Sequence, residues 1–228
     1  MKIGIDIGGS HIGIGLVENN GTIVLKKEIY IKDKTDIENR IERYITENVI
    51  EILQAYGVNQ IGIAVPGTVT DKKIIKAVNL GIVDYDLGNI LEQNLLNLGY
   101  TIDVKLKNDG KCAALAEQKY GALQGYDNSI FLCIGTGVGS AVIFDGKLLE
   151  PKNVPGFEFS HTIIHKNGAL CNCGKRGCFE VYASLKRFKE KLVKEFNLNS
   201  LSGECIREFI RQNSDNSTLK YIINNYVE

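Results

Sequence analysis

Apolar residues in the first part of the chain alternate with polar residues or glycine at a period of two. This period predicts three antiparallel strands, over 2–7, 12–17 and 22–31, because successive side chains of a strand face opposite sides of a sheet. Gly8-Gly9-Ser10 is a tight turn between the first two strands. Asn19-Asn20-Gly21 is typical of a hairpin turn between the second and third.

Helical periodicity then replaces the alternation. From 36 to 56 apolar residues recur every three or four positions with charges between them, which predicts an amphipathic helix. The apolar segment 60–65, stopped by Pro66-Gly67, predicts a buried strand. The same rules predict a strand over 102–107 and helices over 87–98, 108–120, 181–196, 204–211 and 219–226.

The strand, glycine turn and strand of residues 7–17 recur at residues 134–144, and one shift superimposes Gly8 on Gly135. Two glycine-rich hairpins can also be alike by chance. A duplicated βββαβ unit with such a turn is the pattern of the actin-like, ribonuclease-H-like ATPase fold. We therefore predict an α/β protein of two lobes, 1–121 and 122–228, with a nucleotide cleft between them.

Charge and composition narrow the possible partners. Lys plus Arg and Asp plus Glu number 27 each, so no overall field favours nucleic acid or an anionic membrane. The chain enters its first strand at Lys2 without a secretory signal pattern. No apolar stretch approaches the roughly 20 residues that span a bilayer. These features indicate a cytoplasmic protein.

The cysteines fall into two groups. Cys171, Cys173 and Cys178 lie within eight positions, ten residues after His161, and this set supplies the four ligands of a tetrahedral zinc site. Four protein ligands leave no open coordination position, so the zinc would be structural. A chance grouping of thiols would leave the glycines around them unexplained. The other cysteines stand alone and read as ordinary thiols: Cys112, Cys133 and Cys205.

Glycine turns allow backbone N–H groups to approach an anion, which suits a phosphate. Asp6 lies on the strand that leads into the first turn. A carboxylate beside a phosphate is favourable only with a cation such as Mg²⁺ between them. Thr136 adds a hydroxyl donor to the second turn. Each turn alone is a weak signal, but two at matched positions favour a nucleoside triphosphate.

Asp109 follows a predicted strand and opens a predicted helix beside Asn108. It is either the N-cap of that helix or a general base that accepts the proton of an attacking hydroxyl. Asp109, Glu158 and Glu180 in one pocket would repel an anionic substrate. A neutral polyol that donates hydrogen bonds to carboxylates fits such a pocket, and a sugar meets this description.

Taken in order, these segments resemble the ROK family (repressors, open reading frames and sugar kinases), most closely its glucokinases and related hexose kinases. The resemblance covers residues 2 to 184, and its zinc-loop part is the most specific. It is carried by Asp6-Ile-Gly-Gly-Ser10, Pro66-Gly67, Asn79-Leu80, Asn108-Asp109, Gly135-Thr-Gly-Val-Gly139, Gly156-x-Glu158-x-x-His161 and Cys171-x-Cys173-Gly-x-x-Gly-Cys178-x-Glu180.

The resemblance implies ATP-dependent phosphorylation of a neutral hexose, glucose at O6 being favoured, with Asp109 as the catalytic base. It implies small-molecule partners only, with neither nucleic acid nor membrane, and a homodimer. The sugar would be held by Gly67, Asn79, Asn108, Glu158, His161 and Glu180. Mg²⁺ and the ATP phosphates would be held by Asp6, Gly8, Gly9, Ser10, Gly135, Thr136 and Gly137. Zinc would be held by His161, Cys171, Cys173 and Cys178.

The chain also departs from the family pattern. Ser160 replaces a glycine, His11 replaces a lysine or asparagine, and Ser140-Ala141 replace glycines. Members usually run on past the position of Glu228 into a strand and a Gly-Gly turn that embrace the adenosine, so the second lobe is expected to be incomplete. Two alternatives therefore stay open: a sugar-binding protein without kinase activity, and a transcriptional regulator, which the neutral charge disfavours.

Overall fold

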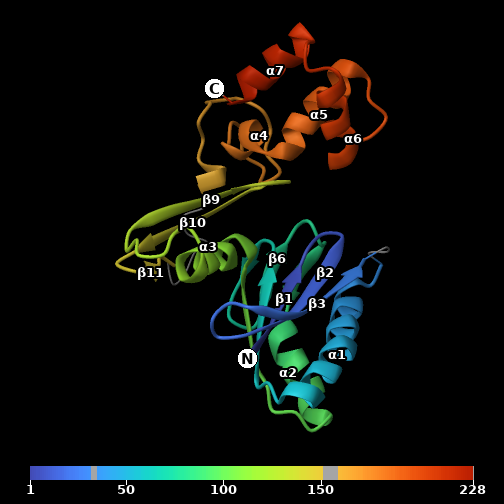
Figure 1. The fold of residues 1–228 in the computed structure, drawn as a ribbon, viewed down its shortest axis with the longest axis vertical. Helices are drawn as coiled ribbons and strands as arrows, with labels where there is room; N and C mark the ends of the chain where they lie inside the picture. The colour runs from blue at the N-terminus through green and yellow to red at the C-terminus, as the bar shows by residue number, and fades with distance from the viewer. Residues whose placement is uncertain (32–34, 151–158, 228) are drawn as a thin grey trace. The chain divides into compact units, whose positions relative to one another are not determined.

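The chain forms two compact units, Met1–Asp127 (unit 1) and Asn128–Glu228 (unit 2). The structure is a computed structural model that describes residues 1–31, 35–150 and 159–227 (Figure 1).

Unit 1 is built on a five-stranded sheet of order β3-β2-β1-β4-β8. β1 and β2 pair antiparallel, as do β2 and β3, which confirms the three strands predicted from the alternation. β1, β4 and β8 run parallel, so their carboxyl ends lie at the same end of the sheet. The strands are β1 (Lys2–Ile7), β2 (His11–Val17), β3 (Ile23–Tyr30), β4 (Gln60–Val65) and β8 (Asp103–Asn108).

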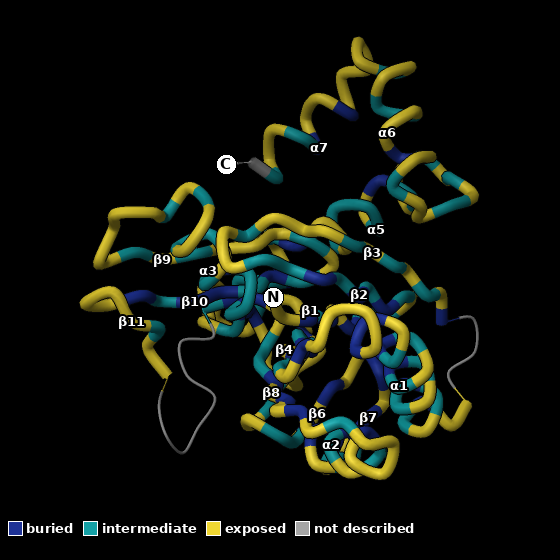
Figure 2. Tube along the Cα trace, turned by 60° about the horizontal axis from the view of Figure 1, so that its bottom comes forward, coloured by how far each residue is buried: buried dark blue, intermediate teal, exposed yellow. Residues whose placement is uncertain are grey.

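One face of this sheet carries the core of unit 1. The buried positions of β1 and β2 follow the predicted period of two, and helix α1 packs against β2 and against α2 (Figure 2). The opposite face of the same strands is lined by glycines, among them Gly4 and its register partner Gly15. The helices of unit 1 are α1 (Ile37–Tyr56), α2 (Leu87–Asn97) and α3 (Asp109–Tyr120), close to their predicted bounds.

A second, three-stranded sheet between β4 and α2 was not predicted. It consists of β5 (Thr68–Val69), β6 (Ile74–Ala77) and β7 (Ile82–Tyr85), in the order β5-β6-β7. These strands are two to four residues long, too short to show a period of two. They form because antiparallel pairing and burial of Ile74 and Ile82 hold them, which no local pattern reveals.

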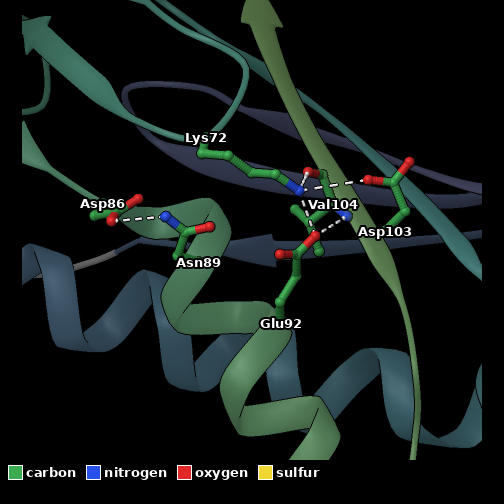
Figure 3. Close-up of polar contacts among 6 residues, drawn as sticks. All are labelled: Lys72, Asp86, Asn89, Glu92, Asp103 and Val104. Carbon is green, nitrogen blue, oxygen red and sulfur yellow. Dashed lines mark hydrogen bonds and ion pairs between the residues drawn. The ribbon is translucent and has the colours of Figure 1, made fainter.

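Side chains cover the free edge of the main sheet at β8 (Figure 3). The Val104 N–H donates to Glu92 Oε1 at 2.8 Å, and the Val104 carbonyl accepts from Lys72 Nζ at 2.6 Å. Lys72 also forms an ion pair with Glu92. The two side chains thus replace a neighbouring strand for Val104, which protects the edge from pairing with another chain.

Unit 2 begins with the predicted repeat of the glycine hairpin. β9 (Ser129–Ile134) and β10 (Val138–Phe144) pair antiparallel, and β11 (Lys147–Leu148) completes a sheet of order β11-β10-β9. The turns of the two hairpins, 8–10 and 135–137, have the same length. After β11, residues 159–227 form helices and two isolated bridges, so within the described residues the repeat stops at its third strand.

The helix predicted over 181–196 is wrong in one respect: it is two helices. α4 (Glu180–Ala183) ends at Ser184, whose backbone is extended (φ −73°, ψ 140°), and α5 (Leu185–Phe196) starts directly after it. The apolar period continues through the break and therefore hides it. The remaining elements are the 3₁₀ turn η1 (Phe159–His161), α6 (Gly203–Gln212) and α7 (Ser217–Val227).

Helices α5, α6 and α7 share a small core of their own, and their outer faces are mostly exposed (Figure 2). Its buried members are Leu192, Ile206, Leu219 and Ile222. Over the described parts of the chain, we find no helix that combines the length and apolarity needed to cross a bilayer.

Candidate functional site

In unit 1, predicted site residues gather where the parallel strands end. Asp6 is in β1, Asn108 ends β8, and Asp109 opens α3. Partial burial and the neighbouring Asp109 carboxylate raise the pKa of Asp6, and His11 opposes the shift. Two acidic groups whose charges interact at this end of the sheet could hold a cation, since a bound cation removes their repulsion.

The first glycine turn is closed by its own backbone. The Gly8 N–H donates to the His11 carbonyl oxygen at 2.8 Å, and the Ser10 hydroxyl lies 3.3 Å from His11 Nδ1. A Cβ on Gly8 would lie 3.2 Å from the same carbonyl oxygen, whereas a Cβ on Gly9 would meet nothing within 4 Å. The tip of the turn at Gly9 is therefore open to an approaching group.

Asn108 organises the neighbourhood of Asp109. Its side-chain oxygen accepts from the Lys111 N–H at 3.1 Å and caps α3, and its side-chain nitrogen donates to the Gly67 carbonyl at 3.0 Å. The N-cap role considered for Asp109 thus belongs to Asn108, while Asp109 Oδ1 accepts from the Gly110 N–H at 2.8 Å. Asn79, also predicted to bind sugar, lies exposed in the turn between β6 and β7.

In unit 2, the four predicted zinc ligands come together. One ligand atom from each of His161, Cys171, Cys173 and Cys178 lies within 4.8 Å of all the others. The Cys173 and Cys178 Sγ atoms are 3.7 Å apart, and Cys171 Sγ is 3.6 Å from His161 Nδ1. Tetrahedral zinc, with Zn–S of about 2.3 Å and Zn–N of about 2.0 Å, requires about 3.8 Å and 3.5 Å for these edges. Two edges of the donor set therefore match tetrahedral zinc, and the four residues could hold one metal ion.

Glycines shape the loop that carries the thiols. Gly174 and Gly177 have φ of +90° and +80°, and a Cβ on Gly177 would lie 1.7 Å from the His165 carbonyl oxygen. The Cys171 N–H donates to the Lys175 carbonyl at 2.8 Å, and the Gly174 N–H donates back to Cys171 at 3.0 Å. This tight turn brings Cys171 and Cys173 to one side of the loop.

The ionisation of the three thiols differs. Burial raises the pKa of Cys178 to about 12 and also raises that of Cys171. Burial acts in the same sense on Cys173, but hydrogen bonds from the Lys175 backbone and the other thiols outweigh it and lower the Cys173 pKa. A metal that binds here must displace protons from buried thiols, which makes its affinity depend on pH.

Glu180 contacts the second glycine turn, a relationship that the sequence did not predict. Its Oε2 accepts from the Val138 N–H at 3.1 Å, and its Oε1 lies 3.9 Å from Cys171 Sγ. Within that turn the Gly135 N–H donates to the Gly137 carbonyl at 2.8 Å, and Thr136 is exposed. Glu158, predicted to bind sugar, lies outside the described residues.

The chain is similar to sugar kinases and to repressors. It is 31% identical over 201 residues to a glucokinase of Thermotoga maritima, with 86% of this chain and 62% of that protein covered. It is 34% identical over 200 residues to a xylose repressor of Bacillus subtilis, with 84% of this chain and 50% of the repressor covered. The chain therefore spans less than two thirds of the length of these two curated relatives.

Solved structures agree with the sequence matches. The crystal structure of a ROK family glucokinase from Streptomyces griseus in complex with glucose and AMPPNP matches with a TM-score of 0.81 and 28% identity. That match covers 99% of this chain and 75% of the glucokinase chain. The predicted fold class is thereby confirmed at the level of the family's α/β, actin-like architecture. The ROK family model matches residues 2–227, and the chain is a member of the ROK family.

Proposed function

We propose that this protein is an ATP-dependent sugar kinase that phosphorylates a hydroxyl of a neutral hexose, glucose at O6 being the favoured substrate. The observation that carries the proposal is the position of Asp109 at the carboxyl ends of the parallel strands, where its charge interacts with that of Asp6. Similarity to a glucokinase bound to glucose and AMPPNP supports the substrate class.

In this proposal Asp109 accepts the proton of the sugar hydroxyl as that oxygen attacks the γ-phosphorus, and the bond from phosphorus to the ADP oxygen breaks. Asn108 acts on Asp109 by fixing the start of α3 and on Gly67 by holding its carbonyl. Asn79, Glu158, His161 and Glu180 complete the proposed sugar contacts.

The proposed phosphate contacts are the two glycine turns: Gly8, Gly9 and Ser10 in unit 1, and Gly135, Thr136 and Gly137 in unit 2. Asp6 would hold Mg²⁺, which neutralises phosphate charge when bound. His161 and the three cysteines would hold zinc. His161 Nδ1 faces Cys171 Sγ, which leaves Nε2 as the nitrogen for a sugar or a carboxylate.

The test is an ADP-release assay over a panel of neutral hexoses, comparing the wild type with Asp109→Asn and with Asp71→Asn. Asp71 is an exposed aspartate of the same unit and serves as the matched control. Loss of a general base lowers turnover by about 10²- to 10⁴-fold. Asp109→Asn is expected to show this loss while glucose still binds by calorimetry, and Asp71→Asn is expected to behave as the wild type. Full turnover in Asp109→Asn would refute the assigned role.

A second candidate is a sugar-binding regulator without phosphoryl transfer, which the similarity to a xylose repressor favours. Calorimetric titration with AMPPNP, with and without glucose, distinguishes the two. A kinase binds the nucleotide, whereas a regulator of this kind binds sugar alone and shifts a DNA fragment in a gel.

A further inference from the structure

The second glycine turn, residues 135–137, is held on both sides by the segment that follows the last metal ligand. On one side, Glu180 Oε2 accepts from the Val138 N–H at 3.1 Å. On the other, the Leu185 N–H donates to the Gly135 carbonyl at 2.9 Å. The two bonds fix the exit and the entry of the turn from a single stretch of chain.

Close packing accompanies the first of these bonds. A Cβ on Gly137 would lie 2.6 Å from Glu180 Oε2, so a side chain at this position would displace the carboxylate from where it now lies. The other carboxylate oxygen lies 3.9 Å from the sulfur of Cys171. Glu180 is therefore in contact with the turn through one oxygen and beside a metal ligand through the other.

The break between α4 and α5 serves the second bond. If the helix continued through Ser184, the Leu185 N–H would donate to the carbonyl four residues earlier, within the helix. The extended backbone of Ser184, which is 2% exposed, instead frees the Leu185 N–H to reach Gly135. The helix break and the carboxylate contact thus act on the same turn.

We propose that Glu180 is a positioning residue through which the metal-ligand loop sets the conformation of the second glycine turn. Cys178 precedes Glu180 by two residues, and Cys171 Sγ lies beside the Glu180 carboxylate. Ligation of these two cysteines therefore restrains both the backbone and the side chain of Glu180. Metal binding would then order the turn and raise its affinity for phosphate. The second part of this inference rests on the proposed function, and the first does not.

The first test measures amide hydrogen exchange of Val138 and Leu185 by NMR, in protein loaded with ZnCl₂ and in chelated protein. A hydrogen bond to a charged group protects an amide by about tenfold or more. Chelation of the wild type is therefore expected to accelerate exchange at Val138 by at least about tenfold. It should accelerate exchange at Leu185 by less, because the acceptor there is the neutral Gly135 carbonyl, and leave Ile5 in β1 unchanged. In zinc-loaded Glu180→Ala, Val138 is expected to exchange as fast as in the chelated wild type.

Three further variants separate positioning from folding. Glu180→Gln keeps an acceptor oxygen and should keep Val138 protected, whereas Glu180→Asp is one methylene shorter and should not. Glu195→Ala, an exposed glutamate of α5, is the matched control and should resemble the wild type. If Glu180→Ala does not hold one zinc per chain, Glu180→Asp takes its place. Val138 exchange that is indifferent to zinc in the wild type, or equally protected in Glu180→Asp, would overturn the proposal.

The second test measures AMPPNP affinity by calorimetry. Chelation of the wild type is expected to weaken binding by about tenfold, the factor expected from losing one such bond, and Glu180→Gln to retain the zinc-dependent affinity. If AMPPNP does not bind in any state while exchange still responds to zinc, the kinase proposal fails and the positioning role of Glu180 stands. If AMPPNP binds equally with and without zinc, control of phosphate affinity by the metal loop is refuted.

Discussion

The side-chain nitrogen of Asn108 donates a 3.0 Å hydrogen bond to the carbonyl oxygen of Gly67. This bond joins the second residue after β4 to the residue that caps α3, so the two parallel strands are tied together where they end. The same asparagine thus positions both Gly67 and Asp109. Substitutions at Asn108 therefore test how this part of unit 1 is held in place.

Two substitutions at Asn108 separate the helix cap on α3 from the hydrogen bond to Gly67. Aspartate caps a helix as well as asparagine does, so Asn108→Asp should keep the cap and lose only the bond to Gly67. Asn108→Ala should lose both and destabilise the protein by about 2 kcal/mol, since each bond contributes about 1 kcal/mol. Thermal unfolding measures the difference. Equal stability of Asn108→Ala and the wild type would contradict the structure.

Gly67 should not tolerate a side chain. Its φ is +100°, and a Cβ would lie 2.2 Å from the Lys76 carbonyl oxygen. Gly67→Ala is therefore expected to cost about 3 kcal/mol or more in unfolding free energy, because backbone strain and a backbone clash add. Gly57→Ala is the control: its φ is +59° but a Cβ there meets nothing within 4 Å, so it should cost only about 1 kcal/mol. Urea unfolding compares the two.

Asp6→Asn is expected to stabilise the metal-free protein at neutral pH. Burial and Asp109 raise the Asp6 pKa above its usual 3.8, so the folded state binds the proton more tightly than the unfolded state does. Stability therefore falls as pH rises from 3.8 through the raised pKa, and the loss is complete above it. The gain in Asp6→Asn should stay below about 1 kcal/mol, because Asp6 is only partly buried and solvent screens its charge.

The pH dependence checks this sign. The melting temperature of Asp6→Asn minus that of the wild type should be positive at pH 7 and shrink as pH is lowered toward 3.8. The same variant should lose the dependence of turnover on Mg²⁺ concentration together with most of its activity. A difference that grows on acidification would show that Asp6 is stabilised as a carboxylate.

Loss of one metal ligand should act on unit 2 alone. Cys178 is fully buried in the ligand cluster, so Cys178→Ser is expected to abolish zinc binding and to destabilise this unit by about 3 kcal/mol or more. Cys205→Ser, at an exposed cysteine of α6, is the control and should retain one zinc per chain. Zinc content and proteolysis of the two units measure the outcome, and a zinc-loaded Cys178→Ser protein would refute the site.

We predict that the protein self-associates through the edge strand β9. It lies at the end of its sheet, and three of its apolar side chains are exposed: Ile130 at 61%, Leu132 at 46% and Ile134 at 48%. An exposed apolar edge is a template for pairing with another chain. Leu132→Lys should reduce concentration-dependent light scattering, whereas Lys147→Arg, in β11 at the other edge, should leave it unchanged.

Local patterns were sufficient where an element depends on its own residues. The period of two in β1 and β2 and the helical period of α1 reflect burial of one face, and this burial is written into neighbouring positions. The same holds for the thiols, because Cys171, Cys173 and Cys178 lie close enough in the chain for a short turn to gather them. The break at Ser184 was missed because its cause, the bond from the Leu185 N–H to the Gly135 carbonyl, spans 50 residues along the chain.

The sequence by itself therefore determined the strands and helices with clear periods, the repeated glycine turn and the donor set of the metal site. Only the tertiary structure decided that the Asn108 side chain bonds to Gly67, and that Lys72 and Glu92 cover the edge of β8. It also decided that Glu180 bonds to Val138. The physical reason is the same in each case: a hydrogen bond between distant segments forms only when folding removes both partners from water, and it leaves no periodic trace in the chain.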